Sequence, residues 1–310
     1  MKIVLLGGAS FLGKNLAISL IDSTDNEITA VDEKRSYFND LPNYVVNKIN
    51  IRECVCSKDT NFDELLNNQQ IVYHLLSTVI PATSNKNISQ EIGDNIIGTA
   101  KLLDACVRNG VKKVVFFSSG GAVYGKDCEC PIHESTLLQP ITSYGLQKVT
   151  IEKMLYLYNY IYDLDYTIIR LSNPYGPYQR PNGVLGVVTT FIYRALNKQK
   201  IKIFGNGEVV RDFIYVEDAI KAILNVVSLG GSERVFNIGS GIGTSINEVV
   251  QNIHDVLGVD IIKEYMSSRK ADVPQNYLDV TKYEQIFGRL STTDMMVGIK
   301  KTANFLQNMS

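Results

Sequence analysis

The sequence predicts an α/β protein with a doubly wound parallel sheet and a smaller C-terminal α/β lobe. Short apolar runs alternate with helical patterns up to residue 171, as in the βαβ units that build a parallel sheet. A glycine-rich turn joins the first apolar run to the first helical pattern. The alternation then gives way to a stretch rich in Pro, Gly, Asn and Tyr at residues 172–183, which predicts a long ordered loop before the lobe.

The expected elements follow the hydrophobic periodicity along the chain. Before the loop, we expect strands at residues 2–6, 28–31, 71–76, 113–117 and 166–171, and helices at residues 11–21, 96–107 and 144–162. After the loop, we expect strands at residues 201–204, 211–216 and 235–238, and helices from residue 217, at 246–257 and at 295–306. The predicted domains are residues 1–171 plus about 213–239, and residues 172–212 plus about 240–310.

Composition and charge exclude several classes of partner. Of the 310 residues, 31 are Lys or Arg and 32 are Asp or Glu, so the net charge of −1 favours neither nucleic acid nor an anionic membrane. No run approaches the ~20 apolar residues of a transmembrane helix. The first residues resemble a buried strand rather than a secretory signal, which predicts a cytoplasmic protein.

The cysteines predict neither a disulfide framework nor a metal site. There are five, an odd number in a long chain, which is typical of reduced thiols. Two C-x-C pairs occur, Cys54 with Cys56 and Cys128 with Cys130. They lack the wider spacing of common zinc sites, so we expect no metal.

The turn after the first strand has the pattern of a phosphate-binding loop. Its residues are Gly7, Gly8, Ser10, Phe11, Leu12 and Gly13, with Ser10 in place of the middle glycine. Glycines here let backbone N–H groups approach a pyrophosphate, and the start of the next helix adds partial positive charge. Asp32 ends the second strand, where a carboxylate accepts the ribose hydroxyls of NAD and repels the extra phosphate of NADP. This combination predicts NAD binding on a Rossmann-like domain.

Tyr144 and Lys148 form a Y-x-x-x-K motif that places both side chains on one helix face. An ammonium close to a phenol stabilises the phenolate, so the tyrosine can exchange a proton near neutral pH. Tyr44 and Lys48 match the same motif in a loop-like stretch. Tyr144 instead begins a helix soon after the strand that ends near Ser119, and ligands of doubly wound sheets bind beyond such strand ends. The catalytic pair is therefore expected to be Tyr144 and Lys148.

Taken in order, these motifs resemble those of the extended short-chain dehydrogenase/reductase family. Within it, they resemble the NAD-dependent nucleotide-sugar epimerases and dehydratases of the UDP-glucose 4-epimerase type. Further matching segments are residues 95–99 (NIIGT), 118–125 (SSGGAVYG), 170–177 (RLSNPYGP), 204–208 (FGNGE), 211–218 (RDFIYVED) and 269–274 (RKADVP). The resemblance spans nearly the whole chain and implies NAD as cofactor and a nucleotide-diphosphate sugar as substrate.

The resemblance also assigns roles by position. Besides the phosphate loop, Asp32, Tyr144 and Lys148, the implied cofactor contacts are Asn50, Ile51, Leu76, Asn95 and Ser118. The implied substrate contacts are Asn173, Phe204, Arg211, Arg269 and Asn276. The two arginines would clamp the diphosphate, because a guanidinium binds phosphate through two parallel hydrogen bonds.

Three departures from the family pattern bear on the chemistry. Gly120 stands where the family usually has a Ser or Thr that bonds the reacting sugar oxygen, so Ser119 is assigned that role, with a water as the alternative. Gly121 and Ala122 replace the acidic pair of the dehydratases, which argues against dehydration. Asn276 stands where strict UDP-galactose/UDP-glucose epimerases often have tyrosine, which leaves room for a different sugar.

The expected function is that of an NAD-dependent 4-epimerase acting on a UDP-hexose through a 4-keto intermediate. The alternative is an NAD(P)H-dependent reductase of a dTDP-linked 4-keto-6-deoxy-hexose in surface polysaccharide synthesis, because Gly120 and Asn276 depart from the epimerase pattern. A third possibility is a catalytically silent nucleotide-binding protein, against which the intact Tyr144 and Lys148 count. The resemblance further implies a homodimer through the helices at residues 92–108 and 144–162.

Overall fold

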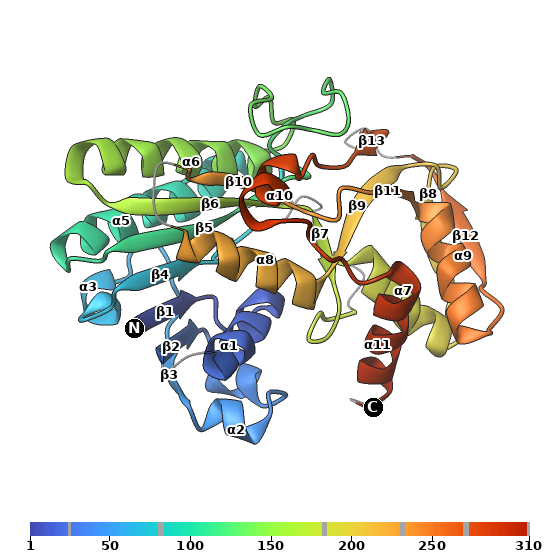
Figure 1. The fold of residues 1–310 in the computed structure, drawn as a ribbon, viewed down its shortest axis with the longest axis horizontal. Helices are drawn as coiled ribbons and strands as arrows, with labels where there is room; N and C mark the ends of the chain where they lie inside the picture. The colour runs from blue at the N-terminus through green and yellow to red at the C-terminus, as the bar shows by residue number, and fades with distance from the viewer. Residues whose placement is uncertain (24–25, 80–83, 182–184, 230–232, 269–272, 309–310) are drawn as a thin grey trace. The chain divides into compact units, whose positions relative to one another are not determined.

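The computed structural model describes residues 1–310 apart from 24–25, 80–83, 182–184, 230–232, 269–272 and 309–310. The chain divides into two compact units, each assembled from separate stretches (Figure 1). The first unit comprises Met1–Ser119, Thr142–Ile169 and Val226–Val235. The second comprises Gly120–Ile141, Arg170–Asn225 and Phe236–Ser310.

A seven-stranded parallel sheet, all of whose strands except β10 lie wholly or mainly in the first unit, has the order β10-β6-β5-β4-β1-β2-β3. Its strands are β1 (Lys2–Leu6), β2 (Glu27–Asp32), β3 (Ile49–Glu53), β4 (Ile71–His74), β5 (Lys113–Ser119), β6 (Asp165–Leu171) and β10 (Val235–Ile238). The helices are α1 (Phe11–Ser23), α2 (Asn43–Val46), α3 (Phe62–Leu66), α4 (Ile88–Ile92), α5 (Gly98–Arg108) and α6 (Ser143–Tyr162), with a 3-10 turn at Arg35–Phe38 and a π-helical turn at Gly93–Ile97. The strand order reverses direction at β1, as in the doubly wound dinucleotide-binding fold.

The strands are continuous apolar runs because both faces of the sheet are covered. Residues 3–6 of β1 and 114–117 of β5 are all buried. From β1 the chain proceeds toward β2 and β3 in one direction and toward β4 and β5 in the other. Right-handed crossovers therefore place α1 on one face and α5 with α6 on the opposite face (Figure 1). The predicted α/β doubly wound fold is confirmed.

The second unit is built from short sheets and amphipathic helices. Its strands are β7 (Asn173–Tyr175), β8 (Ile201–Phe204), β9 (Val210–Tyr215), β11 (Gly243–Ser245), β12 (Lys263–Met266) and β13 (Gln275–Asn276). Its helices are α7 (Val187–Leu196), α8 (Val216–Ser228, which ends in the first unit), α9 (Ile246–Leu257), α10 (Thr281–Phe287) and α11 (Met295–Asn308). β9 lies between β11 and β13 and also pairs with β7, while β8 pairs with β12. Apolar side chains of α7, α9 and α11 share one core.

The long periodic elements lie where the sequence predicts them, and the short ones differ. The expected loop at residues 172–183 contains β7. Helix α7 is not expected from the sequence. Its first residues are β-branched, and its N-cap, Gly186, makes no side-chain hydrogen bond, so the sequence has no clear signal for the start of a helix. The expected domain boundary differs as well, because Gly120–Ile141 belongs to the second unit. There the Ile132 N–H donates to the Tyr277 carbonyl at 2.9 Å, which ties this stretch to the C-terminal segment. Among the described helices, none has the length and apolarity to span a membrane.

Candidate active site

The turn between β1 and α1 is a backbone cradle that side chains would fill. Gly7 has φ +87°, a conformation that favours glycine. A Cβ at Gly13 would lie 2.5 Å from the Gly7 carbonyl oxygen, so the helix can start this close to the turn only without a side chain. The Ser10 hydroxyl donates to the Gly7 carbonyl at 2.6 Å and accepts from the Gly13 N–H at 3.1 Å. Ser10 thus braces the turn.

The cradle presents donors and an acceptor that fit NAD. Phe11 and Leu12 begin α1, where first-turn N–H groups point out of the helix toward a phosphate. The Asp32 carboxylate is fixed at the end of β2, because Oδ2 accepts from the Ala9 N–H and Oδ1 from the Glu33 N–H, both at 2.8 Å. Each oxygen keeps a second lone pair for a ribose hydroxyl. Backbone donors for a pyrophosphate and a fixed carboxylate for a ribose match the two polar parts of the dinucleotide.

Tyr144 lies in the first turn of α6, which the Thr142 side chain caps by accepting from the Gly145 N–H. Burial raises the pKa of Tyr144 to about 12, and its hydrogen bond with the Ser119 hydroxyl lowers it. The Lys148 ammonium lies 5.5 Å from the centre of the Tyr144 ring. The structure therefore brings together the three residues that the sequence predicts as catalytic.

Lys148 is buried, with its Nζ donating to the Phe117 carbonyl at 2.8 Å and lying 4.7 Å from the Phe116 ring centre. Burial lowers the pKa of Lys148 to about 8, and the negative charge of Glu152 raises it. Glu152 is itself buried and accepts from the Ser118 hydroxyl at 2.5 Å. Tyr144, Lys148 and Glu152 follow one another at intervals of four residues, so they share one face of α6.

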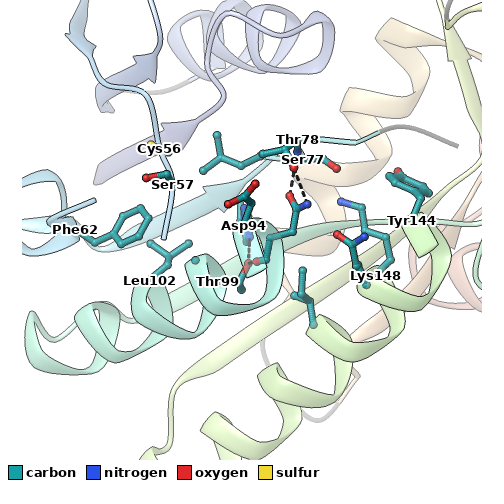
Figure 2. A pocket seen from close by; sticks show the side chains of 16 residues that line it. Cys56, Ser57, Phe62, Ser77, Thr78, Asp94, Thr99, Leu102, Tyr144 and Lys148 are labelled. Atoms are coloured by element: carbon teal, nitrogen blue, oxygen red, sulfur yellow. Dashed lines mark hydrogen bonds between the residues drawn. The ribbon is translucent and has the colours of Figure 1, made fainter. Parts of the chain in front are cut away.

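A pocket in the first unit lies beside these side chains (Figure 2). It is lined by Cys56, Ser57, Phe62, His74, Leu76, Ser77, Thr78, Asp94, Asn95, Gly98, Thr99, Leu102, Tyr144, Gln147, Lys148 and Ile151. Asn95 holds one wall, because its Oδ1 accepts from the Thr78 N–H at 2.9 Å and its Nδ2 donates to the Thr78 hydroxyl at 2.7 Å. The π-helical turn at Gly93–Ile97 carries Asn95 at this position. Leu76, Asn95, Tyr144 and Lys148, all predicted from the sequence, line this one pocket.

Three predicted cofactor residues lie elsewhere. Asn50 and Ile51 are in the middle of β3, since Asn50 pairs with Thr29 while the β2 end at Asp32 pairs with Glu53. Asn50 lines a different, polar hollow with Thr29, Arg52, Glu64, Leu65, Asn67 and Gln69. The residues that follow β3, including Cys56 and Ser57, line the pocket instead. The Ser118 hydroxyl bonds Glu152, so Ser118 acts on the pocket through that carboxylate.

In the second unit, three of the predicted substrate residues lie on neighbouring strands of one small sheet. Arg211 on β9 pairs with Asn276 on β13, and Asn173 on β7 pairs with Phe213 of β9. The Asn173 amide donates to the Asp212 carbonyl at 2.9 Å. Phe204 ends β8, in the separate pair with β12, and is 38% exposed. Arg269 lies outside the described residues.

Packing explains why glycine stands at position 120. A Cβ at Gly120 would lie 2.6 Å from Cδ1 of Leu278, which is completely buried. The Asn276 amide donates to the Gly120 carbonyl at 3.3 Å and is also buried. A side chain at position 120 requires buried Leu278 to move, whereas the neighbouring Ser119 already has a hydroxyl in a hydrogen bond with Tyr144.

The sequence missed several polar residues of the pocket. His74 is fully buried and its imidazole stays neutral near pH 7, because burial and the positive charge of Lys148 lower its pKa to about 3. Its Nε2 lies 3.0 Å from the Thr99 hydroxyl, which donates to the Asn95 carbonyl. Glu152 could have been found from its four-residue spacing after Lys148, whereas His74 and Thr99 carry no such signal. Over the described stretches, no group of three or more His, Cys, Asp or Glu side chains is arranged to hold a metal ion.

The Rossmann fold, the phosphate cradle and the Tyr144–Lys148 pair together define a dinucleotide-dependent enzyme of the short-chain dehydrogenase/reductase type. A model of the NAD dependent epimerase/dehydratase family matches residues 3–239. The chain belongs to this family and is an NAD-dependent enzyme of the extended short-chain dehydrogenase/reductase group.

Individual relatives differ in the reaction that they catalyse. UDP-glucose 4-epimerase of Mycolicibacterium smegmatis is 33% identical over 241 residues, which cover 78% of this chain and 77% of that protein. dTDP-4-dehydro-6-deoxyglucose reductase of Escherichia coli is 29% identical and covers 96% of this chain and 95% of its own. The crystal structure of UDP-glucose 4-epimerase from Thermotoga maritima with UDP-glucose is 32% identical, has a TM-score of 0.90, and covers 100% of this chain and 99% of its own.

Proposed function

We propose that this protein is an NAD-dependent nucleotide-sugar 4-epimerase acting on a UDP-linked hexose. The observation that carries the proposal is the grouping of buried Lys148 with the half-buried Tyr144 and Ser119, in the unit that also holds the phosphate cradle and Asp32. The likeness of the whole chain to the Thermotoga maritima epimerase with UDP-glucose supports the sugar class.

Tyr144 exchanges the proton of the reacting sugar hydroxyl. When bound, NAD supplies the acceptor and donor of a hydride. Burial, opposed in part by the Ser119 hydrogen bond, raises the pKa of Tyr144 to about 12, so at neutral pH its phenol holds the proton that reduction of a 4-keto sugar consumes. The opposite half-reaction needs the phenolate, which the Ser119 hydrogen bond and nearby positive charge stabilise. The 4-keto sugar turns over between the two half-reactions, so the hydride returns to its other face and the configuration at C4 is inverted.

The substrate side of the proposal rests on the second unit. Arg211 and Arg269 are assigned to the diphosphate, Asn173 and Asn276 to the sugar, and Phe204 to the nucleotide base. Arg211 is anchored for this role, because its guanidinium donates to the carbonyls of Val210 at 2.8 Å and Val273 at 2.7 Å.

A reductase of a nucleotide-linked 4-keto-6-deoxy sugar is the second candidate. It is favoured by the 29% identity to the Escherichia coli reductase over nearly the full chain. Tyr144 and Lys148 would serve both reactions, and only the fate of the cofactor differs. Net oxidation of NADH by a 4-keto sugar nucleotide marks the reductase, whereas conversion of a UDP-hexose with no cofactor change marks the epimerase.

The activity test compares two tyrosines that share the same motif. Wild-type protein is incubated with UDP-glucose, UDP-galactose and their N-acetylated forms, and the sugars are separated by chromatography. Tyr144→Phe should lower conversion by about 10²–10⁴-fold, the range for loss of a general acid–base group. Tyr44→Phe is the matched control, since Tyr44 is 47% exposed on α2. Equal activity of the two variants would refute the assignment of the base.

We further propose a homodimer through the helices at residues 92–108 and 144–162. The C-terminal half of α6 exposes Tyr156, Leu157, Tyr160 and Ile161, between 49% and 80% of each side chain. Such apolar surface at i, i+1, i+4 and i+5 forms a stripe that a second copy of the helix would cover. A cytoplasmic location and a place in surface polysaccharide synthesis belong to the same proposal, because nucleotide sugars are the building blocks of such polymers.

A further inference from the structure

Two cysteines follow strand β3 at the rim of the pocket. The sulfur atoms of Cys54 and Cys56 lie 4.0 Å apart, with the Cys56 thiol donating to the Cys54 sulfur. A disulfide requires its sulfurs about 2 Å apart, so a small movement of the two side chains brings them to that distance. The backbone thus holds two thiols ready for a bond between them.

The pair connects two parts of the cofactor site. The Cys54 N–H donates to the Asp32 carbonyl at 2.8 Å, at the end of β2 where the ribose carboxylate stands. Cys56 and Ser57 line the pocket shared with Lys148. Both thiols are partly buried against the core, while Val55 between them is 68% exposed. Small reagents therefore reach the segment from solvent.

The environment of the two thiols differs in a way that assigns their roles. Burial and the neighbouring Cys54 and Asp32 raise the pKa of Cys56 to about 12, so Cys56 keeps its proton. That proton is directed at the Cys54 sulfur, so the two thiols already face one another. Cys54 is accordingly the attacking sulfur and Cys56 the resolving one.

We propose that Cys54 and Cys56 form a redox-modifiable dithiol whose oxidation to a disulfide speeds the dissociation of NAD. The oxidant is a small-molecule disulfide. Cys54 attacks one of its sulfurs and releases one thiol, and Cys56 then displaces the second thiol from the mixed disulfide. Two protein thiols and one small disulfide thus become one protein disulfide and two small thiols.

The coupling to NAD follows from the distance that must close. A disulfide needs its sulfurs about 2 Å apart, against 4.0 Å here, so the Cys54 and Cys56 side chains must together close about 2 Å. Cys56 lines the pocket, and the backbone N–H of Cys54 is bonded to the Asp32 carbonyl. The new bond therefore changes the pocket wall at Cys56 and constrains the chain next to Asp32. This inference rests on the proposed cofactor site.

The second C-x-C pair provides the matched control. The Cys128 thiol donates to the Gly125 carbonyl at 3.7 Å, and both cysteines of this pair belong to the second unit. Cys130→Ser therefore removes a thiol of the same spacing that does not line the pocket. Cys56→Ser removes the resolving thiol and leaves Cys54 to form a mixed disulfide.

The experiment treats NAD-loaded protein with glutathione disulfide and measures two quantities. Peptide mass spectrometry detects the Cys54–Cys56 disulfide, and exchange against isotopically labelled NAD gives the cofactor dissociation rate. We expect wild type and Cys130→Ser to form the disulfide and to release NAD at least tenfold faster, with reversal by a reductant. Cys56→Ser should form no intramolecular disulfide.

Two results would overturn the dithiol: no disulfide between Cys54 and Cys56, or a disulfide that leaves the NAD dissociation rate unchanged. Thermal unfolding of the oxidised protein, run alongside, separates local change from loss of the fold. A reduced protein that takes up no NAD would overturn the proposed cofactor site and the coupling with it. The two failures are distinguishable because the disulfide is measured by mass, without reference to NAD.

Discussion

Replacing Glu152 by Gln should move the alkaline limit of activity to lower pH. Glu152 is buried one helical turn beyond Lys148, and its negative charge is what opposes the effect of burial on the Lys148 pKa. The other titratable groups around Lys148 are Tyr144 on the same helix and His74 on β4. Tyr144 holds its proton and His74 is neutral near pH 7, so neither replaces the lost charge.

The size of the effect follows from the pKa of Lys148, which is about 8 with Glu152 in place. Loss of one close opposite charge lowers such a pKa by about one unit. At pH 8 the charged fraction of Lys148 then falls from about one half to about one tenth, roughly a fivefold loss. At pH 6 the fraction stays above about nine tenths in both proteins. Activity of Glu152→Gln should therefore be near wild type at pH 6 and about fivefold lower at pH 8.

The assay is the pH dependence of UDP-hexose conversion between pH 5.5 and 9, with NAD content measured at each pH. Ser118→Ala is the matched control, because it removes the 2.5 Å hydrogen bond to Glu152 and keeps the charge. An alkaline limit that does not move in Glu152→Gln, or that moves equally in Ser118→Ala, would refute the charge argument.

Three further changes test the packing, the pH dependence and the assembly. Gly120→Ser should lower the melting temperature by a few degrees with no gain in activity, because overpacking against buried Leu278 costs about 1–3 kcal/mol; a more active and equally stable variant would contradict the assignment of Ser119. His74 has a pKa of about 3 in the folded protein, against 6.5 in the unfolded chain. Between these pH values the unfolded chain binds more protons, so the free energy of unfolding decreases as the pH is lowered. Wild type should lose about 2 kcal/mol of unfolding free energy between pH 7 and 5 that His74→Asn does not lose, measured by urea titration at both pH values. Tyr160→Lys should convert a dimer to a monomer in sedimentation equilibrium, since Tyr160 is 80% exposed on the proposed interface, whereas Gln251→Lys on α9 should not.

The features that could be predicted from the sequence are those that repeat over many residues or depend on glycine. The phosphate cradle follows from steric limits at Gly7 and Gly13, which no other residue meets. The Tyr144–Lys148 pair follows from helix geometry, because four residues return a side chain to the same face. Both depend on local chain geometry, so a linear pattern is enough to find them.

The features that escaped depend on where strands end. Asn50 stands where the family usually has an Asp against adenine, and β3 continues to Glu53, so Asn50 lies three residues short of the strand end. The residues that reach the pocket are Cys56 and Ser57, beyond that end. His74 escaped for another reason: a single polar residue inside an apolar strand shows a function only when the neighbouring helix is placed against it.

The NAD content of the purified protein, released by denaturation, tests the central claim most directly. A 4-epimerase must keep its cofactor between two half-reactions, so the account predicts about one NAD per chain. This measurement requires no choice of substrate. A protein that carries no NAD, binds NADH reversibly and oxidises it with a 4-keto sugar nucleotide would contradict the epimerase and identify the reductase.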